Sequence, residues 1–376
     1  MTDWLMFPAL AKPVNPPRAK LADGPALRQV RGWLWFMAAM VFLMVLIGGA
    51  TRLTESGLSI TEWKPVTGAL PPLTQADWII LFNKYKLIPQ YKELFPDMTL
   101  AHFKYIYFWE WGHRLHARMV GLEMLLPLIW FWARGKIPNG FAFKLFGIGC
   151  LIGLQGLLGW YMVKSGLSKR VEVSQYLLAS HLLLASVTYS ALIWQVVGAR
   201  PRVTQPGRDR LRPLAAIILG LVFLQLGMGG LVAGLRAGLT YNTWPLMDGR
   251  FIPAMHNLLA SHPLWRNFFE NVLTVQFQHR MMAYVIAGLA IWQMVQARAV
   301  GGSALARSRV IVGIVIAQIV LGIVTLLLQV PLWAGLAHQS TAFVLLAMCV
   351  VHMRALLPSS AISADNAAAR SAMISA

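Results

Sequence analysis

Long apolar stretches, separated by polar segments that contain glycine and proline, dominate the pattern along the chain. Eight stretches reach the length of about 20 residues that a helix needs to cross the hydrocarbon core of a bilayer. They cover residues 33–51, 105–132, 143–163, 174–197, 214–234, 271–296, 309–329 and 337–356. The pattern therefore predicts an all-α integral membrane protein with eight transmembrane helices.

The composition agrees with this prediction. Of the 376 residues, 57% are hydrophobic and 12% are charged, about half the charged fraction of a soluble domain. Eighteen Lys and Arg residues fall on the side of both termini and twelve on the other, which predicts cytoplasmic N- and C-termini. The net charge of +19 then reflects topology and contact with anionic lipid. Because no nucleic-acid-binding motif accompanies it, we expect no nucleic-acid partner.

The ends of the chain indicate a compartment. Residues 1–32 form a polar, proline-rich arm without a cleavable signal pattern, and with too little Ser for a mitochondrial transit peptide. A multi-pass protein of the bacterial inner membrane is the simplest interpretation, with residues 357–376 as a disordered cytoplasmic tail. The two cysteines, Cys150 and Cys349, lie within predicted spans, where we expect small buried side chains.

The chain repeats itself at an offset of 181 residues. Seven identities share this offset: Gly48, Gly49, Gly57, Leu58, Trp63, Gly68 and Pro72 match Gly229, Gly230, Gly238, Leu239, Trp244, Gly249 and Pro253. Downstream, Gln155-x3-Gly159 matches Gln318-x3-Gly322. Each half holds four spans, an even number, so both halves enter the membrane in the same direction. This predicts two four-helix bundles, residues 33–200 and 201–356, related by a pseudo-twofold axis along the membrane normal.

Four histidines stand at repeat-equivalent positions in the even-numbered spans. They are His113 and His181 in the first half, and His279 and His338 in the second. Each falls within the first ten residues of its predicted span, near the outer, periplasmic surface. Ionisable residues in a span are costly and are functional candidates. A single buried histidine would more often be a polar core residue, but paired imidazoles on facing helices are a common grip on haem iron. A zinc or di-iron site would need more carboxylates or cysteines.

One carboxylate distinguishes the halves. Glu110 precedes His113 by three residues, so both lie on one helix face, whereas Gln276 holds the equivalent position before His279. The difference suggests different tasks for the two sites. A local ion pair of Glu110 with Arg114 or Arg118 is the alternative interpretation.

Other polar residues of the spans leave alternatives open. Arg114 and Arg280 follow the first histidine of each half; they suit haem propionates or extend outward to the interface. His116 is a weaker candidate ligand, because Met282 occupies its place in the second half. We assign His102, His256, His262 and His352 no functional role.

Together these residues resemble the haem A synthase family over residues 33–356. The resemblance rests on Gly-Gly-x-Thr-Arg-Leu-Thr-x-Ser-Gly-Leu-Ser at 48–59, on Trp63, Pro65, Gly68, Pro71 and Pro72, and on Glu110-x-x-His113-Arg114, His181, His279-Arg280 and His338. One subset of that family has a cysteine pair in its first outer loop. This chain lacks the pair and is similar to the cysteine-poor proteobacterial and mitochondrial type.

The resemblance implies a membrane-bound haem-dependent oxidoreductase. It would oxidise a porphyrin-ring methyl group of haem O to a formyl group, giving haem A for terminal oxidase assembly. It implies a haem b cofactor on His279 and His338, and substrate haem O between His113 and His181. Glu110 would be the catalytic residue near the reacting edge, with Arg114, Arg280 and Gln276 in support.

The resemblance also implies partners. Haem O would be delivered by the haem O synthase, a protohaem farnesyltransferase, and an unidentified protein would exchange electrons; a homo-oligomer stays open. Two other functions need the same four ligands: a di-haem membrane electron carrier of cytochrome b type, and a haem transporter. Only the enzyme requires the acid in one half.

Overall fold

The computed structural model describes residues 25–137, 140–169, 171–198 and 206–357, and these contain helices and no strand. Eight helices are long, and each overlaps one predicted span. They are α1 (Pro25–Leu53), α4 (Leu100–Ala133), α5 (Phe141–Lys169), α6 (Gln175–Gly198), α7 (Arg212–Gly234), α10 (Val272–Ala297), α11 (Gly302–Leu327) and α12 (Leu332–Leu356).

Six of these helices, α1, α5, α6, α7, α11 and α12, are long and apolar enough to cross a membrane. The chain is therefore a membrane protein with multiple spanning helices. The two long helices outside this set are α4 and α10, which carry Glu110–Arg114 and Gln276–Arg280. Their polar residues lower the mean hydropathy, so the two helices with the most polar candidate residues are the ones least marked as membrane spans, while His181 and His338 lie on the apolar helices α6 and α12.

Several boundaries differ from the sequence prediction. Helix α1 begins at Pro25, so residues 25–32 of the predicted arm are helical; proline is favoured in the first turn because its missing N–H is not needed there. Helix α4 begins at Leu100, capped by the Thr99 hydroxyl, which accepts from the backbone N–H of His102. His113 thus lies thirteen residues into its helix rather than within the first ten. Residues 1–24, 199–205 and 358–376, with the predicted cytoplasmic tail, lie outside the described residues.

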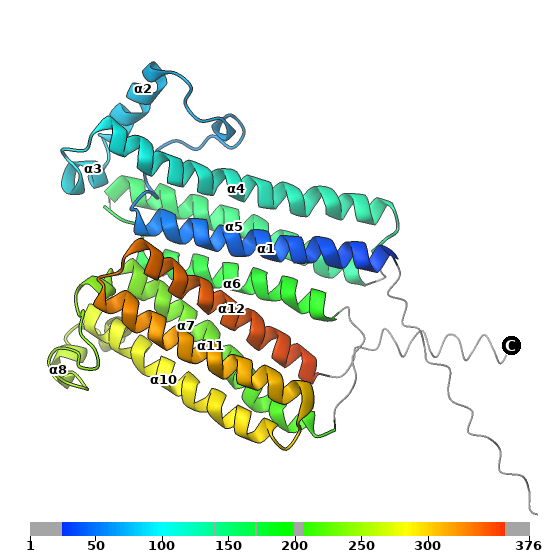
Figure 1. Ribbon diagram of the computed structural model, residues 1–376. Helices are drawn as coiled ribbons and strands as arrows, with labels where there is room; N and C mark the ends of the chain where they lie inside the picture. Colours follow the sequence, from blue (N-terminus) through cyan, green and yellow to red (C-terminus); the bar gives the residue numbers. More distant parts are fainter. Residues whose placement is uncertain (1–24, 138–139, 170, 199–205, 358–376) are drawn as a thin grey trace, which may run out of the picture.

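Short helices that the sequence analysis did not predict gather at one end of the molecule. They are α2 (Gln75–Tyr85), α3 (Pro89–Leu94), α8 (Met255–Leu258) and α9 (Asn267–Glu270), with the 3-10 turns η1 (Thr67–Ala69), η3 (Ala237–Leu239) and η4 (Leu264–Arg266). A further 3-10 turn, η2 (Arg208–Leu211), lies at the other end, where Leu211 packs with Leu356. Figure 1 shows α2, α3 and α8 opposite the end where α1 begins and α12 finishes. Thr74 and Asp77 form a capping box that starts α2, a pattern readable in the sequence.

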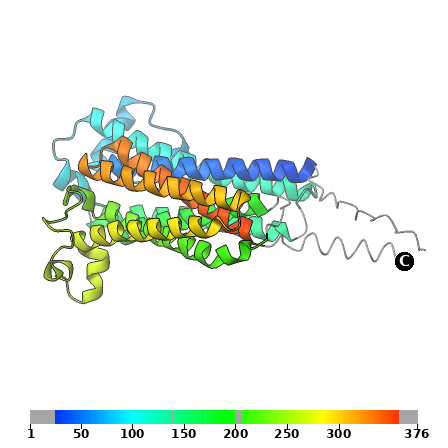
Figure 2. The same cartoon turned by 60° about the horizontal axis from the view of Figure 1, so that its bottom comes forward.

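The long helices pack in two closed sets. In the first half α1 contacts α4, α4 contacts α5, α5 contacts α6, and α6 contacts α1. In the second half the same cycle runs through α7, α10, α11 and α12. The sets meet where α1 and α6 pack against α12 and α7 (Figures 1 and 2). Helices α4 and α6, and likewise α10 and α12, therefore stand at opposite corners of their sets.

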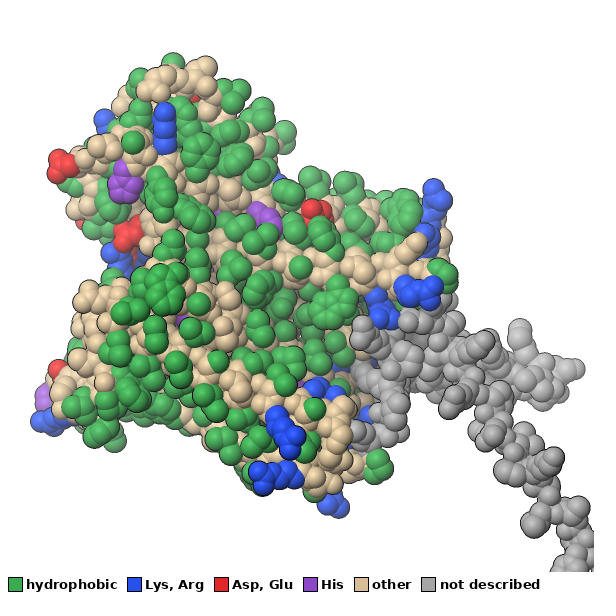
Figure 3. Space-filling view, in the orientation of Figure 1, with side chains coloured by type: hydrophobic (Ala, Val, Ile, Leu, Met, Phe, Trp, Pro, Cys, Tyr) green, Lys and Arg blue, Asp and Glu red, His purple; other side chains and the backbone are tan. Residues whose placement is uncertain are grey.

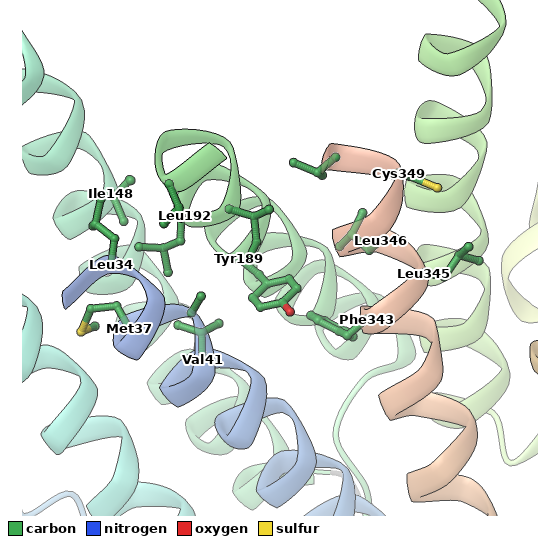
Figure 4. Packing of buried hydrophobic residues seen from close by; sticks show 14 of the residues in the cluster. Leu34, Met37, Val41, Ile148, Tyr189, Leu192, Phe343, Leu345, Leu346 and Cys349 are labelled. Atoms are coloured by element: carbon green, nitrogen blue, oxygen red, sulfur yellow. The ribbon is translucent and has the colours of Figure 1, made fainter. Parts of the chain in front are cut away.

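The largest buried cluster lies where the two sets meet. Leu34, Met37 and Val41 of α1 pack with Tyr189 and Leu192 of α6 and with Phe343, Leu346 and Cys349 of α12 (Figure 4). The ring centroids of Tyr189 and Phe343 are 5.5 Å apart. Cys349 is buried as predicted, but Cys150 is exposed on α5, so that part of the prediction is wrong. Hydropathy does not distinguish core from lipid-facing positions, and hydrophobic side chains cover the flank in Figure 3.

Glycines bring the first helix of each half against the last helix of the other. A Cβ on Gly49 of α1 would overlap Oε1 of Gln339 on α12. A Cβ on the repeat-equivalent Gly230 of α7 would lie 2.7 Å from the Cα of Ala179 on α6. Small residues permit close helix approach within membranes, and here both halves use the same position for it.

Ion pairs join the halves at the end that carries the short helices. Arg52 donates to Glu172 over 2.9 Å, and Arg236 lies 2.8 Å from Glu55 and also pairs with Glu172. Glu55 and Arg236 are repeat-equivalent, and both have left-handed backbones, with φ of 56° and 50°. Partly exposed ion pairs contribute little to stability, so their main effect is to fix the alignment of the two halves.

The glycine contact between α6 and α7 yields a test. Gly230→Ala should lower the thermal unfolding temperature of the detergent-purified protein, because the methyl group meets the backbone of Ala179 and overpacking costs about 1–3 kcal/mol. Gly220→Ala on the same helix is the matched control, since a Cβ there meets nothing within 4 Å; it should leave the unfolding temperature unchanged or raise it. Equal behaviour of the two variants would contradict the close approach.

Candidate functional site

The four histidines come from helices at opposite corners of each set. His113 of α4 and His181 of α6 belong to the first half, and His279 of α10 and His338 of α12 to the second. The His279 and His338 ring centroids are 6.5 Å apart, and the ring planes meet at 73°. Two imidazoles that ligate one metal ion from opposite sides, each about 2 Å from it, have centroids about 6 Å apart. The second pair is therefore spaced to hold one iron ion.

Each imidazole packs on a glycine of a neighbouring helix. A Cβ on Gly48 of α1 would lie 3.3 Å from Nε2 of His113, and a Cβ on Gly229 of α7 would lie 3.4 Å from Cε1 of His279. The last helices repeat the arrangement, because a Cβ on Gly159 of α5 or Gly322 of α11 would lie 3.2 or 3.0 Å from Cε1 of His181 or His338. All four glycines belong to the sequence repeat. Their shared feature is the room they leave for a ring.

The histidines also retain unused hydrogen-bonding capacity. The Nδ1 atoms of His181, His279 and His338 are buried without a hydrogen-bond partner, which is costly unless another group engages the ring. Within the described residues no three His, Cys, Asp or Glu side chains converge on a metal position. A haem needs only two protein ligands, because its porphyrin supplies the other four nitrogens. The spacing of the second pair therefore fits a haem, and the unpartnered Nδ1 of His181 leaves a ring of the first pair available to another group.

Glutamines tie the ligand helices to their neighbours. Gln155 of α5 donates to the carbonyl oxygen of His181 over 3.0 Å, and the equivalent Gln318 of α11 donates to that of His338 over 2.8 Å. Gln225 of α7 donates to the carbonyl oxygen of His279 over 3.0 Å. From the sequence, Gln155 and Gln318 were recognised only as members of the repeat, and Gln225 was not recognised. Gln225 could have been found because it is the one amide side chain in the otherwise apolar helix α7.

Glu110 is buried and fully engaged. Its Oε2 accepts hydrogen bonds from the Ser59 hydroxyl over 2.7 Å and from the Ile60 backbone N–H over 2.6 Å. Its Oε1 pairs with Arg114, so the ion pair named as the alternative interpretation is present. The carboxylate joins α4 to the loop that follows α1, one helical turn from His113.

Gln276 occupies the same place in the second half, but it donates hydrogen bonds to the loop where Glu110 accepts them. Its Nε2 donates to the backbone carbonyls of Ala237 and Tyr241, over 2.8 and 3.3 Å, where Glu110 accepts. Its Oε1 accepts from Arg280 over 2.9 Å. The loop of the first half thus presents donors to an acid, and the loop of the second presents acceptors to an amide. The two sites are chemically distinct down to their backbone contacts.

The arginines that follow the ligands are also unequal. Arg114 donates to the carbonyls of Ile60 and Glu62 over 2.8 and 3.0 Å in addition to Glu110. Arg280 donates from Nη2 to Tyr241 and Gln276, while its buried Nε and Nη1 have no partner. Neither side chain extends freely outward to the interface. Arg280 retains donors that suit a carboxylate such as a haem propionate.

A further pair of repeat-equivalent residues, Arg118 and Tyr284, links the outer loops to the ligand helices by hydrogen bonds. Arg118 donates to the carbonyls of Pro65 and Lys64 over 2.8 and 2.9 Å. At the equivalent position of the second half, the Tyr284 hydroxyl accepts from the indole of Trp244 over 3.0 Å. The loops after α1 and α7 therefore fold back along α4 and α10, beside the histidines.

The remaining histidines lie elsewhere. His116 contacts the carbonyl of Met40 over 2.9 Å, so it is a satisfied core residue. The methionine at its place in the second half, Met282, had already made it the weaker candidate ligand. His352 is buried and lies 3.0 Å from Nε2 of Gln293, with Arg307 donating to its other nitrogen. This burial was not predicted from the sequence, from which we assigned His352 no functional role. His102 and His256 lie outside the two sites, on the first residues of α4 and on α8.

Comparison with known proteins shows the family to which the chain belongs. Residues 31–350 match the model of a family described as cytochrome oxidase assembly protein. A haem A synthase of Beijerinckia indica subsp. indica is 53% identical over 348 residues, which cover 90% of this chain and 97% of the relative. Haem A synthases of Azorhizobium caulinodans and Methylobacterium sp. (strain 4-46) are 50% and 49% identical, covering 86% and 93% of this chain and 93% and 98% of the relatives. The chain belongs to the haem A synthase family of cytochrome oxidase assembly proteins.

Proposed function

We propose that this chain is a haem A synthase, which oxidises a ring methyl group of haem O to a formyl group to give haem A for terminal oxidase assembly. The observation that carries the proposal is the contrast between the two histidine sites. The first has the acid Glu110 at the position where the second has the amide Gln276. Identity of about 50% to proteins named haem A synthase, over most of the chain, supports the same conclusion.

The proposed architecture places all eight long helices across the membrane. Helices α4 and α10, with 34 and 26 residues, exceed the length needed and pack within the same closed sets as the six apolar spans. The sets then form two four-helix bundles related by a pseudo-twofold axis along the membrane normal. The excess of Lys and Arg beside the termini supports cytoplasmic ends in a bacterial inner membrane, which puts the histidine sites toward the periplasm.

The second half would hold haem b as a resident cofactor. His279 and His338 would ligate the iron, and the free donors of Arg280 would meet a propionate. A bound haem supplies one-electron redox chemistry, while the protein sets its position and surroundings. Gln276 keeps this site free of a buried carboxylate.

The first half would hold the substrate. His113 and His181 would ligate haem O, and Glu110 would stand one turn from the ligand near the ring edge that reacts. Conversion of a methyl to a formyl group is a net four-electron oxidation: counted with the oxygen atom taken from one water molecule, four electrons and four protons leave, and an oxidant outside this chain must accept the electrons. Because Arg114, Ser59 and Ile60 hold both carboxylate oxygens in place, Glu110 acts in this proposal as a fixed negative charge that stabilises positive charge developing at the carbon.

The proposed reaction needs two kinds of partner. Haem O carries a long apolar chain, so it would reach the site through the bilayer, delivered by the haem O synthase. A redox partner would exchange electrons with haem b. The second candidate function, a di-haem electron carrier of cytochrome b type, would use both haems unchanged and gives Glu110 no task.

Replacement of the acid separates these functions. Glu110→Gln should reduce haem A formation below detection while haem b stays bound, because the change removes the negative charge of the first site and leaves the ligands of the second half untouched. The measurement is chromatography of haems extracted from cells that supply haem O. Glu110→Asp, which keeps an acceptor for Ser59 and Ile60, controls for local unfolding and should retain partial activity. Full haem A formation by the glutamine variant would contradict the proposed role.

Ligand replacement assigns the haems. His279→Ala and His338→Ala should each remove the haem b absorption bands from the purified protein, because one imidazole does not complete a bis-histidine site. His113→Ala should retain those bands and lose haem A formation. If haem b disappears from His113→Ala but persists in His279→Ala, the two halves have been assigned the wrong way round.

A further inference from the structure

The two halves differ in how firmly they fix the first ligand helix. Gln155 and Gln318 bond the carbonyls of His181 and His338 in the same way. The carbonyl of His279 has a third such bond from Gln225. In the part of the chain that the structure describes, no side chain donates to the carbonyl of His113. Among the described residues, His113 is thus the one candidate ligand of the four whose carbonyl accepts no hydrogen bond from a glutamine side chain.

The missing bond follows from one residue. At the repeat offset of 181, the position of Gln225 in α7 corresponds to Met44 in α1, whose thioether has no hydrogen to donate. Four residues further on, Gly229 and Gly48 each pack on the imidazole of His279 and His113, the first nearest Cε1 and the second nearest Nε2. On the helix that packs against each of these rings, the glycine is therefore kept and the amide donor is not.

Gln225 also approaches the imidazole itself. Its Nε2 lies 3.4 Å from Nε2 of His279, and its Oε1 is buried without a partner. The amide therefore sits beside both the backbone and the ring of one ligand, and α7 carries it there from outside the ligand pair. The bond to the backbone carbonyl fixes His279 through its helix. Removal of the hydrogen-bond partners that orient a metal ligand commonly alters metal affinity by about 10–100-fold.

We propose that Gln225 is a positioning residue that makes the second half a site of permanent haem binding, and that Met44 leaves the first half able to exchange its haem. The inference rests on the proposed function, in which one haem is a cofactor and the other a substrate that must leave as product. A fixed His279 slows loss of the cofactor. A His113 free of the third bond allows the product to depart.

Exchange of the two side chains tests the proposal. Each site is isolated first: His113→Ala/His181→Ala leaves only the second half, and His279→Ala/His338→Ala only the first. The proteins are purified in detergent and loaded with haem b in the second half or haem O in the first. Haem transfer to excess apomyoglobin is then followed by absorption.

Gln225→Met should speed transfer from the second half by about tenfold or more, and Met44→Gln should slow transfer from the first half by a similar factor. The reduction potential and low-spin electron paramagnetic resonance signal of haem b should also change in Gln225→Met, which loss of packing alone would not require. Leu224→Met, at an exposed position of α7, is the control and should leave all three readouts as in the parent.

Unchanged transfer from both exchanged proteins would overturn the proposal. Haem A formation by the unaltered chain is measured in parallel, and it tests the proposed function alone: its absence would refute that function whatever the transfer rates. Haem A formation with unchanged transfer rates would refute only the role of Gln225 and Met44.

Discussion

Placement of imidazoles among apolar helices is the constraint on which the rest of the structure depends. Inside a membrane, a polar group must find its partner within the protein or with a bound group, since no water is available to replace it. The Nδ1 atoms of His181, His279 and His338 have no hydrogen-bond partner in the structure, so for these rings the condition is left for a bound group to meet. Each of the four rings packs on a glycine, and a glutamine bonds the backbone carbonyl of three of the histidines. The packing of α1, α5, α7 and α11 is in this sense arranged around the rings.

Duplication explains how two sites arise, and single positions explain why they differ. The helices, the glycines and the His-Arg steps are common to both halves. The differences that matter most to the ligands are Glu110 against Gln276 and Met44 against Gln225. Because the surrounding loops offer donors to the acid and acceptors to the amide, the first of these differences extends to the surroundings of the side chain, whereas the second rests on a single residue.

Much of the helical pattern could be predicted from the sequence, because a bilayer imposes both length and apolarity on a span. All eight predicted stretches are helical, and the ends differ where helices continue beyond the hydrocarbon, as at Pro25 and Thr99. The exposure of Cys150 could not be predicted, since lipid and core accept the same apolar residues. The capping box at Thr74 could have revealed α2, whereas the fold-back of the outer loops depends on tertiary bonds from Arg118 and Tyr284.

The candidate site shows the same division between local and distant information. The histidines and Glu110 stand out because each is costly in a span, and the repeat compares them without a structure. Gln225 did not stand out, because its importance lies in a contact 54 residues away with His279. An alignment of the two halves draws attention to Gln225 only once His279 is known to be a candidate ligand. Its counterpart Met44 then stands out because it lacks the amide donor. Asymmetry between duplicated halves is therefore most informative when it is read outward from the ligands, one contact at a time.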